Sequence, residues 1–167
     1  MQSICAHGQK LLSILISVFN NVHGISFSAE PNRTTEALTG FNQTFAWNLS
    51  LTAEEKSKEL KVQFGPWDKR HSLVKYYLMT IIQEPAGKEI EIRANRSRAK
   101  RLHWTGNLTH AHFVAFQLTD VKRQDAGDYG IRFRVDGFPP RIKEGWLTLS
   151  VQVRCFFYVF KYVVNMW

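Results

Sequence analysis

The sequence predicts an all-β fold, a Greek-key β-sandwich of two antiparallel sheets. Two alternating apolar series, separated by a polar corner, lead to this prediction. They comprise Val114, Phe116, Leu118 and Val121 before the corner, and Tyr129, Ile131, Phe133 and Val135 after it. Apolar residues at every second position are typical of half-buried strands. Gly127 allows the backbone to turn sharply between them, and the Tyr129 hydroxyl can hydrogen-bond back to the corner, as in the tyrosine corner of Greek-key sandwiches.

The corner has the sequence Asp-Ala-Gly-Asp-Tyr, which places Asp125, Gly127 and Tyr129 in register with both apolar series. This spacing resembles strands E and F of the variable-type (V-set) domain of the immunoglobulin superfamily. The resemblance implies an immunoglobulin-like domain over residues 25–153, with strands A, B, E and D in one sheet and G, F, C and C′ in the other. An ordinary antiparallel hairpin with a polar turn is the simpler alternative.

Residues 1–24 are expected to form a secretory signal peptide. Lys10 precedes a short apolar run from Leu11 to Phe19, and Gly24 is small enough for the cleavage site. The run is too short to span a membrane, and a buried amphipathic helix is the alternative. Five N-x-S/T sequons favour the same secreted or cell-surface location. They begin at Asn32, Asn42, Asn48, Asn95 and Asn107.

The next strands precede the corner. Residues 25–29 alternate and predict strand A, and residues 34–38 predict a second half of the same edge. Residues 41–49 predict strand B. In the family that the chain resembles, the two core cysteines would fall at Trp47, seven residues after Gly40, and at Ile131. The resemblance therefore implies that Trp47 and Ile131 form an apolar pair in place of the disulfide. The two cysteines of the chain, Cys5 and Cys155, lie near its ends.

The middle of the chain predicts the strands of the second sheet. Residues 60–64 predict strand C, which Gly65-Pro66 should end, with Phe64 replacing the usual core Trp. Residues 72–82 predict C′ with its neighbourhood, and residues 89–93 predict C″ or the start of D. Residues 102–104 then lead through Gly106 into strand E. Family members often pair an Arg near the start of strand D with the corner Asp, which implies an ion pair between Arg101 and Asp125.

After strand F, residues 136–144 predict the F–G loop. Leu147, Leu149, Val151 and Val153 alternate and predict strand G. The tail, residues 154–167, is mostly apolar but shorter than a membrane span and interrupted by Lys161. A truncated membrane segment, an interfacial segment and an artefact at the sequence end all remain open.

The sequence offers little support for catalysis. It has no G-x-S-x-G, no phosphate-binding glycine loop and no H-E-x-x-H, so we expect no enzyme and no cofactor. His110 and His112 share one strand face but lack a third ligand nearby, so surface histidines are expected and no metal site. A small secreted hydrolase would need a triad that sequence alone does not reveal.

We therefore expect an extracellular recognition or adhesion module that binds a protein partner, or itself, at a cell surface. All five sequons map to the A-B-E-D side, which favours the G-F-C-C′ face as the binding face. Its candidate residues are Lys61, Gln63, Tyr76, Tyr77, Arg132, Arg134, Trp146 and Thr148. The alternative is a basic domain that binds anionic glycans through residues 93–101, because the net charge is +8. Nucleic acid is not an expected partner, and the tail leaves a membrane tether open.

Overall fold

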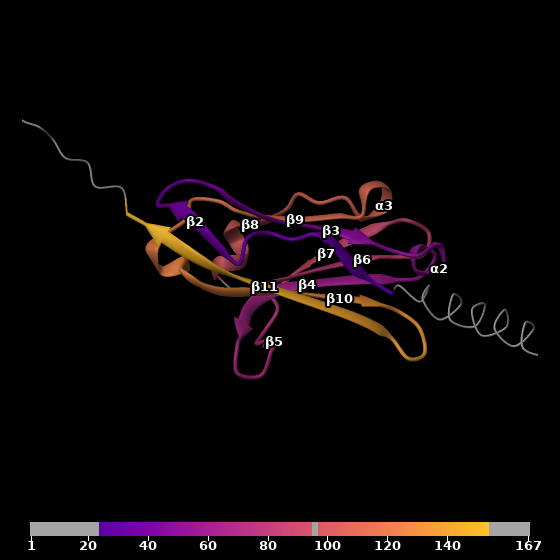
Figure 1. Cartoon of the computed structure of the whole chain (residues 1–167). Coiled ribbons are helices and arrows are strands. Elements are labelled where there is room, and N and C mark those ends of the chain that lie inside the picture. Colours follow the sequence, from indigo (N-terminus) through magenta and orange to yellow (C-terminus); the bar gives the residue numbers. More distant parts are fainter. Residues whose placement is uncertain (1–23, 95–96, 154–167) are drawn as a thin grey trace, which may run out of the picture.

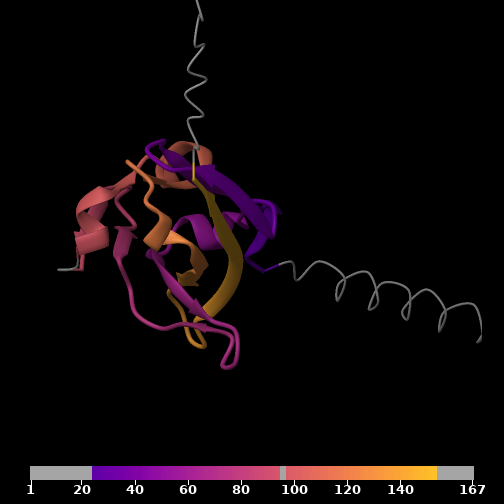
Figure 2. The ribbon, with the colours of Figure 1, turned by 90° about the vertical axis from the view of Figure 1, so that its left-hand side faces the viewer.

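The computed structural model describes residues 24–94 and 97–153, which form two facing β-sheets (Figure 1, Figure 2). The four-stranded sheet has the order β1 (Ser26–Ala29), β3 (Gln43–Ser50), β9 (Phe113–Leu118) and β8 (Leu102–Trp104). The seven-stranded sheet has the order β2 (Thr34–Leu38), β11 (Arg141–Gln152), β10 (Gly127–Val135), β4 (Leu60–Asp68), β6 (Met79–Gln83) and β7 (Glu89–Arg93), and β5 (Leu73–Val74) pairs only with the end of β4. The predicted sandwich and its division into A-B-E-D and G-F-C-C′ sheets are confirmed.

Four short helical turns complete the described residues. They are α2 (Ala53–Lys56), η1 (Ser97–Arg101), α3 (Leu108–Ala111) and η2 (Arg123–Asp125). Most of the predicted signal peptide, the predicted tail, both cysteines and Asn95 lie outside the described residues.

The core between the sheets is built around aromatic rings. Phe64, on β4, is fully buried and stacks on Phe116 at 4.6 Å and on Tyr129 at 5.7 Å between ring centroids. Phe45 stacks on Phe64 at 5.6 Å, and Trp47 meets it edge-on at 6.2 Å. Offset and edge-to-face pairs of this kind add to the stability gained from burial alone. Phe64 therefore occupies the central core position expected of it.

The amino-terminal edge changes sheets. β1 pairs antiparallel with β3, whereas β2 pairs parallel with β11 in the other sheet. The crossing lies between Ala29 and Thr34 and contains Pro31, which has no N–H to offer a strand ladder. The second half of the predicted edge strand therefore exists, but it belongs to the opposite sheet.

The prediction that Gly65-Pro66 ends strand C was wrong, because β4 continues to Asp68. Pro66 lies beyond Phe64, the last residue that pairs with β6. Its carbonyl accepts a hydrogen bond from the Lys75 N–H at 2.9 Å, so its missing N–H lies on the side where β6 no longer runs. The extension of β4 then pairs with β5 to form a hairpin over residues 66–78, which we call the C–C′ hairpin.

Other boundaries also differ from the predictions. C′ is only β6, and the F–G loop is only residues 136–140, because β11 already begins at Arg141 and extends the F–G hairpin. Phe41 lies before β3 and is 48% exposed. Residues 89–93 form C″, since β7 pairs with β6, and residues 102–104 take the place of strand D beside β9.

Candidate binding face

The corner before β10 contains a buried carboxylate that joins three elements. Tyr129 Oη donates a hydrogen bond to the Asp125 carbonyl oxygen at 2.8 Å, which is the geometry of a tyrosine corner. The Asp125 side chain is fully buried and accepts two 2.8 Å hydrogen bonds from the guanidinium of Arg101. The Lys122 N–H donates a third at 2.8 Å, and Arg98 Nε lies 3.6 Å away. The corner thus ties the start of β8 to the start of β10.

These contacts decide the ionisation of the corner. Burial acts to raise the pKa of Asp125, but the hydrogen bonds from Arg101 and Lys122 and the nearby positive charges outweigh it, so its pKa lies below the usual value. Burial raises the pKa of Tyr129. At neutral pH Asp125 is therefore ionised and Tyr129 is neutral. The corner has a structural role and is not a proton-transfer site.

Trp47 and Ile131, the proposed replacement for the disulfide, both lie in the core cluster and are 1% and 0% exposed. Ile131 pairs in register with Phe64 and Gly145. The Trp47 indole points toward Gly145, where an added Cβ would lie 3.3 Å from Nε1. Among the described residues Nε1 has no hydrogen-bond partner. The indole therefore spans the two sheets from β3 to β11.

The outer face of the seven-stranded sheet carries two rows of side chains. Directly paired residues of an antiparallel sheet share a face, so the register defines each row. The first row is Ile142, Arg134, Lys61, Ile82 and Ile90, and the second is Glu144, Arg132, Gln63, Thr80 and Ile92. The alternate positions Val62, Phe64, Ile81 and Phe133 are buried, which confirms that the rows point outward. We call these ten residues the open half of the face.

The centre of the open half is basic. Arg132 Nε lies 3.4 Å from a Glu144 carboxylate oxygen, and Arg134 donates to Asp136 at 3.2 Å. Lys61, between them and β6, has no ion-pair partner among the residues that the structure describes. At half-exposed positions such pairs hold side chains in place more than they stabilise the fold.

The C–C′ hairpin covers the rest of the outer face. In Figure 1 it projects from the sheet of β4, β10 and β11 on the side away from β3 and β9. It rests on Gly65 and Gly130, a cross-strand pair. A Cβ on Gly130 would lie 2.2 Å from the Trp67 ring, and one on Gly65 would lie 2.0 Å from the Tyr76 carbonyl oxygen. Trp67 is only 7% exposed. Because these two glycines have no side chains, the hairpin can pack closely against the sheet.

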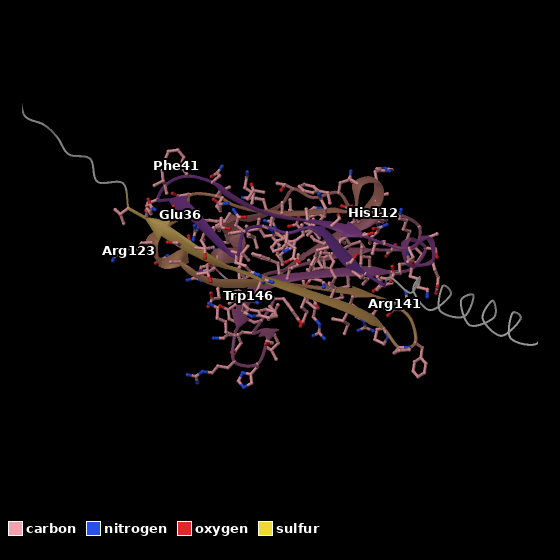
Figure 3. All side chains as sticks on the ribbon, in the orientation of Figure 1. Glu36, Phe41, His112, Arg123, Arg141 and Trp146 are labelled. Atoms are coloured by element: carbon pink, nitrogen blue, oxygen red, sulfur yellow. The ribbon has the colours of Figure 1, made fainter. Side chains whose placement is uncertain are left out.

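Lys69 fastens the hairpin to β10 and β11. Its Nζ lies 2.8 Å from an Asp128 carboxylate oxygen and 3.3 Å from the Thr148 hydroxyl. Lys69 and Arg33 each place a cation 4.9 Å from the centre of the Trp146 ring, which Figure 3 shows beside the hairpin. Two predicted face residues, Trp146 and Thr148, are therefore engaged with the hairpin and only half-exposed.

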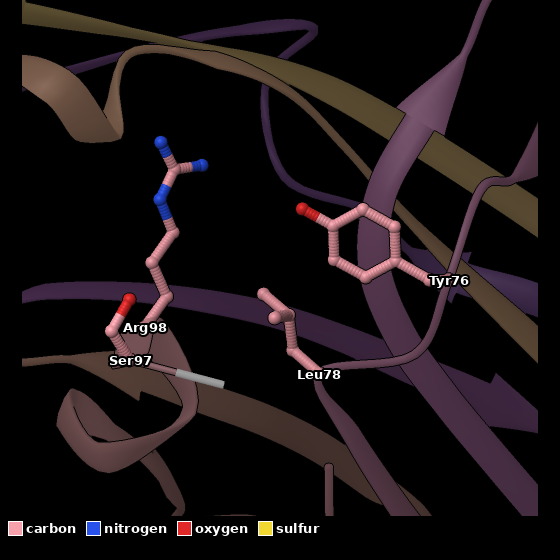
Figure 4. A pocket seen from close by; sticks show the side chains of 4 residues that line it. All are labelled: Tyr76, Leu78, Ser97 and Arg98. Carbon is pink, nitrogen blue, oxygen red and sulfur yellow. The ribbon is translucent and has the colours of Figure 1, made fainter. Parts of the chain in front are cut away.

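The two tyrosines lie apart from the open half. Tyr76 and Tyr77 belong to the connection between β5 and β6, not to C′ itself. Tyr76 lines a pocket of about 380 Å³ with Leu78, Ser97 and Arg98 (Figure 4). Arg98 also donates to the Gln124 carbonyl oxygen and approaches the Tyr129 hydroxyl at 3.4 Å, so this pocket adjoins the corner.

The described arginines of the basic run 93–101 all lie near acidic partners, whereas Lys100 is exposed. Arg93 pairs with Glu91, and Arg98 and Arg101 both turn toward Asp125. These three guanidinium groups are less available to an outside anion than the sequence suggests.

Four described sequon asparagines are exposed; three lie on or beside the four-stranded sheet, and Asn32 lies where the chain crosses between the sheets. Asn48 is on β3 and points away from its buried neighbours. Asn42 precedes β3, Asn107 caps α3 between β8 and β9, and Asn32 lies between β1 and β2. None of these four lies on the open half.

Sequence reasoning missed the aliphatic part of the face. Ile92 and Ile142 are 48% and 46% exposed, and Ile82 and Ile90 lie beside them on β6 and β7. Phe138, at the F–G loop, is fully exposed. The alternating Glu-Ile-Glu-Ile pattern of β7 was a usable signal, but only the register shows that its isoleucines share the face of Lys61.

The described residues hold no gathering of three or more His, Cys, Asp or Glu side chains suited to a metal ion. None of the helices described is long and apolar enough to span a membrane.

Comparison with known proteins identifies the fold. No protein-family model and no curated protein matches the chain. Among solved structures, the chain is similar to murine CRIg, with 10% identity, a TM-score of 0.56 and coverage of 77% of this chain and 98% of that chain. It is also similar to domain 1 of VCBP3 from Branchiostoma floridae, with 12% identity, a TM-score of 0.60 and coverage of 76% and 94%. With the sheet order and the corner described above, these likenesses show that the chain has the variable-type immunoglobulin fold.

Proposed function

We propose that this chain is an extracellular recognition domain that binds a protein partner through the open half of its seven-stranded sheet. One observation carries the proposal: exposed basic and aliphatic side chains gather on this face, while none of the four described sequons lies on it and three of them lie around the other sheet. Arginine is enriched at binding hot spots, and an attached glycan obstructs protein contact. Recognition needs no catalytic group, so we propose a non-enzymatic role.

The proposed location is secreted or cell-surface. The predicted signal peptide and the sequons support it, and the apolar tail leaves a tether to the membrane open. Binding of anionic glycans through residues 93–101 receives less support, since Arg98 and Arg101 both turn toward the buried Asp125. Self-association through the open half would bring its cations together, so it also receives less support.

A comparison of two double variants tests the proposal. Arg132→Glu with Arg134→Glu reverses the charge of the open half, whereas Ser28→Glu with Gln117→Glu places charges on β1 and β9 of the four-stranded sheet and leaves every sequon intact. The fluorescently labelled full chain is applied to cells of the source organism, and bound label is measured by flow cytometry. We expect the first variant to lose binding and the second to keep it, with equal thermal stability. Retention by the first and loss by the second would place the interface on the four-stranded sheet.

A further inference from the structure

We propose that the partner is an acidic protein surface with apolar margins, which docks on the open half alone because the C–C′ hairpin occupies the rest of the face. This inference rests on the proposed function and adds the chemistry of the partner and the extent of its footprint.

The hairpin is a fixed part of the face. Trp67 and Val74 are each 7% exposed, so the hairpin has its own buried side chains. The Leu78 N–H donates to the Phe64 carbonyl oxygen at 2.8 Å, which fastens the return strand to β4. A partner that reached the sheet surface at Gly130 would have to displace the Trp67 ring. Its contact with the sheet surface itself therefore ends at the hairpin.

The accessible remainder has a cationic centre between two aliphatic margins. Lys61 and Arg134 are direct cross-strand neighbours, with Arg132 in the next row. Ile142 lies on one side of them, and Ile82 with Ile92 on the other. Guanidinium groups pair with carboxylates in a bidentate geometry, and isoleucines gain free energy when a partner removes them from water. A protein surface with central Asp or Glu and apolar surroundings satisfies both.

Two other occupants fit less well. A sulfated glycan would use the cations but would leave the isoleucine margins in water. A second copy of the chain, meeting face to face, would bring Lys61 and Arg134 near the same cations of its mate. Like charges placed together across an interface cost several kcal/mol, so the face disfavours its own copy.

The experiment measures binding of the labelled full chain to source-organism cells with four variants. Lys61→Glu with Arg134→Glu should weaken binding at least tenfold, or about 1.4 kcal/mol. Ile92→Ser with Ile142→Ser should weaken it by a similar factor. Arg33→Glu, an exposed charge reversal beside the hairpin-covered Trp146, should leave it within about twofold. Arg33→Glu combined with Arg123→Glu, on η2, matches the charge change of the first double variant and should also leave binding within about twofold.

Salt, trypsin and heparinase treatments of the cells distinguish the occupants. For an acidic protein, binding falls between 50 and 500 mM NaCl and after trypsin, but survives heparinase. Loss after heparinase would make the occupant a glycan and overturn the inference, whether or not trypsin also removes binding, because trypsin releases the core proteins that carry such glycans. Three other results would also overturn the inference. The first is a wild-type dimer in sedimentation velocity that Lys61→Glu with Arg134→Glu abolishes. The others are unchanged cell binding by Ile92→Ser with Ile142→Ser, and loss of cell binding by Arg33→Glu. If the Ser28 and Gln117 variant alone abolishes binding, or no cell binds, the proposed function itself fails.

Discussion

At the residue scale, Asp125 is a buried carboxylate whose oxygens are held by several hydrogen bonds. It is fully buried, yet two hydrogen bonds from Arg101 and one from the Lys122 N–H satisfy its oxygens. Removing one member of a buried ion pair leaves the remaining charge without compensation. Its effect on stability should therefore depend on pH.

We expect Asp125→Asn to lower the free energy of unfolding by about 3 kcal/mol at pH 7, since Arg101 would remain without its counter-ion. The folded-state pKa of Asp125 lies below the value of about 3.9 in the unfolded chain. Its stabilising contribution is therefore complete above pH 4 and is lost as the pH falls through the folded pKa. Urea denaturation of both proteins at pH 7 and pH 2.5 should show their difference shrinking in acid. A difference that stays constant with pH would contradict this account.

Tyr129→Phe removes one buried hydrogen bond, from Oη to the Asp125 carbonyl oxygen. We expect a loss of about 0.5–1.5 kcal/mol in unfolding free energy, because the ring still packs against Phe45 and Phe64. Chemical denaturation measures it, with Tyr77→Phe at a half-exposed position as the control. An unchanged midpoint would show that the corner bond contributes nothing.

Trp47→Ala should destabilise the domain by about 3–5 kcal/mol, because the indole is buried between the sheets and its removal leaves a cavity. The variant Thr44→Ala, on the exposed face of the same strand, is the control. Thermal unfolding followed by circular dichroism compares the two. A loss below about 1 kcal/mol for Trp47→Ala would mean that the surrounding core collapses to fill the space.

At the element scale, the C–C′ hairpin packs on the outer face of the seven-stranded sheet. The outward side of β4 and β10 presents Gly65 and Gly130 where other positions present side chains, and the hairpin lies in that gap. Glycine is used here for close approach rather than for backbone conformation. The hairpin position therefore depends on two absent side chains.

Gly130→Ala should loosen the hairpin, since the new Cβ would meet the Trp67 ring at 2.2 Å. We expect a cost of about 1–3 kcal/mol and faster hydrogen exchange at residues 66–78. A double-mutant cycle with Trp67→Ala separates the steric cause from any other: once the ring is gone, Gly130→Ala should add little. Additive losses would show that Gly130 matters for another reason.

At the scale of the whole molecule, the two sheets have different surroundings. None of the four described sequons lies on the open half, and the seven-stranded sheet divides into the hairpin-covered part and the open half. On this basis we propose the open half as the surface for a protein partner.

A glycan introduced on the open half should block binding. Thr80→Asn with Ile82→Thr creates a sequon at an outward position of β6, and Thr80→Gln with Ile82→Thr is the matched control without one. Expressed in a secretory host, the first variant should gain mass that peptide N-glycosidase F removes and should lose cell binding relative to the control. Equal binding by a fully glycosylated variant would place the interface elsewhere.

The sequence by itself determined the fold class, because core strands must alternate apolar and polar residues wherever one face is buried. Val114, Phe116, Ile131 and Phe133 are all buried in the structure. It also predicted the pairing of Arg101 with Asp125, although only through resemblance, since nothing local in the chain brings residues 24 positions apart together.

Only the tertiary structure decided three features. They are the continuation of β4 through Gly65-Pro66, the packing of the hairpin on the sheet, and the cross-strand row that contains Ile82 and Lys61. Gly65 and Pro66 do not end β4. The hairpin packs where Gly65 has no side chain, and no neighbouring strand needs the N–H that Pro66 lacks. Which residues share a face depends on the register between strands, and register is fixed by packing across the whole sheet.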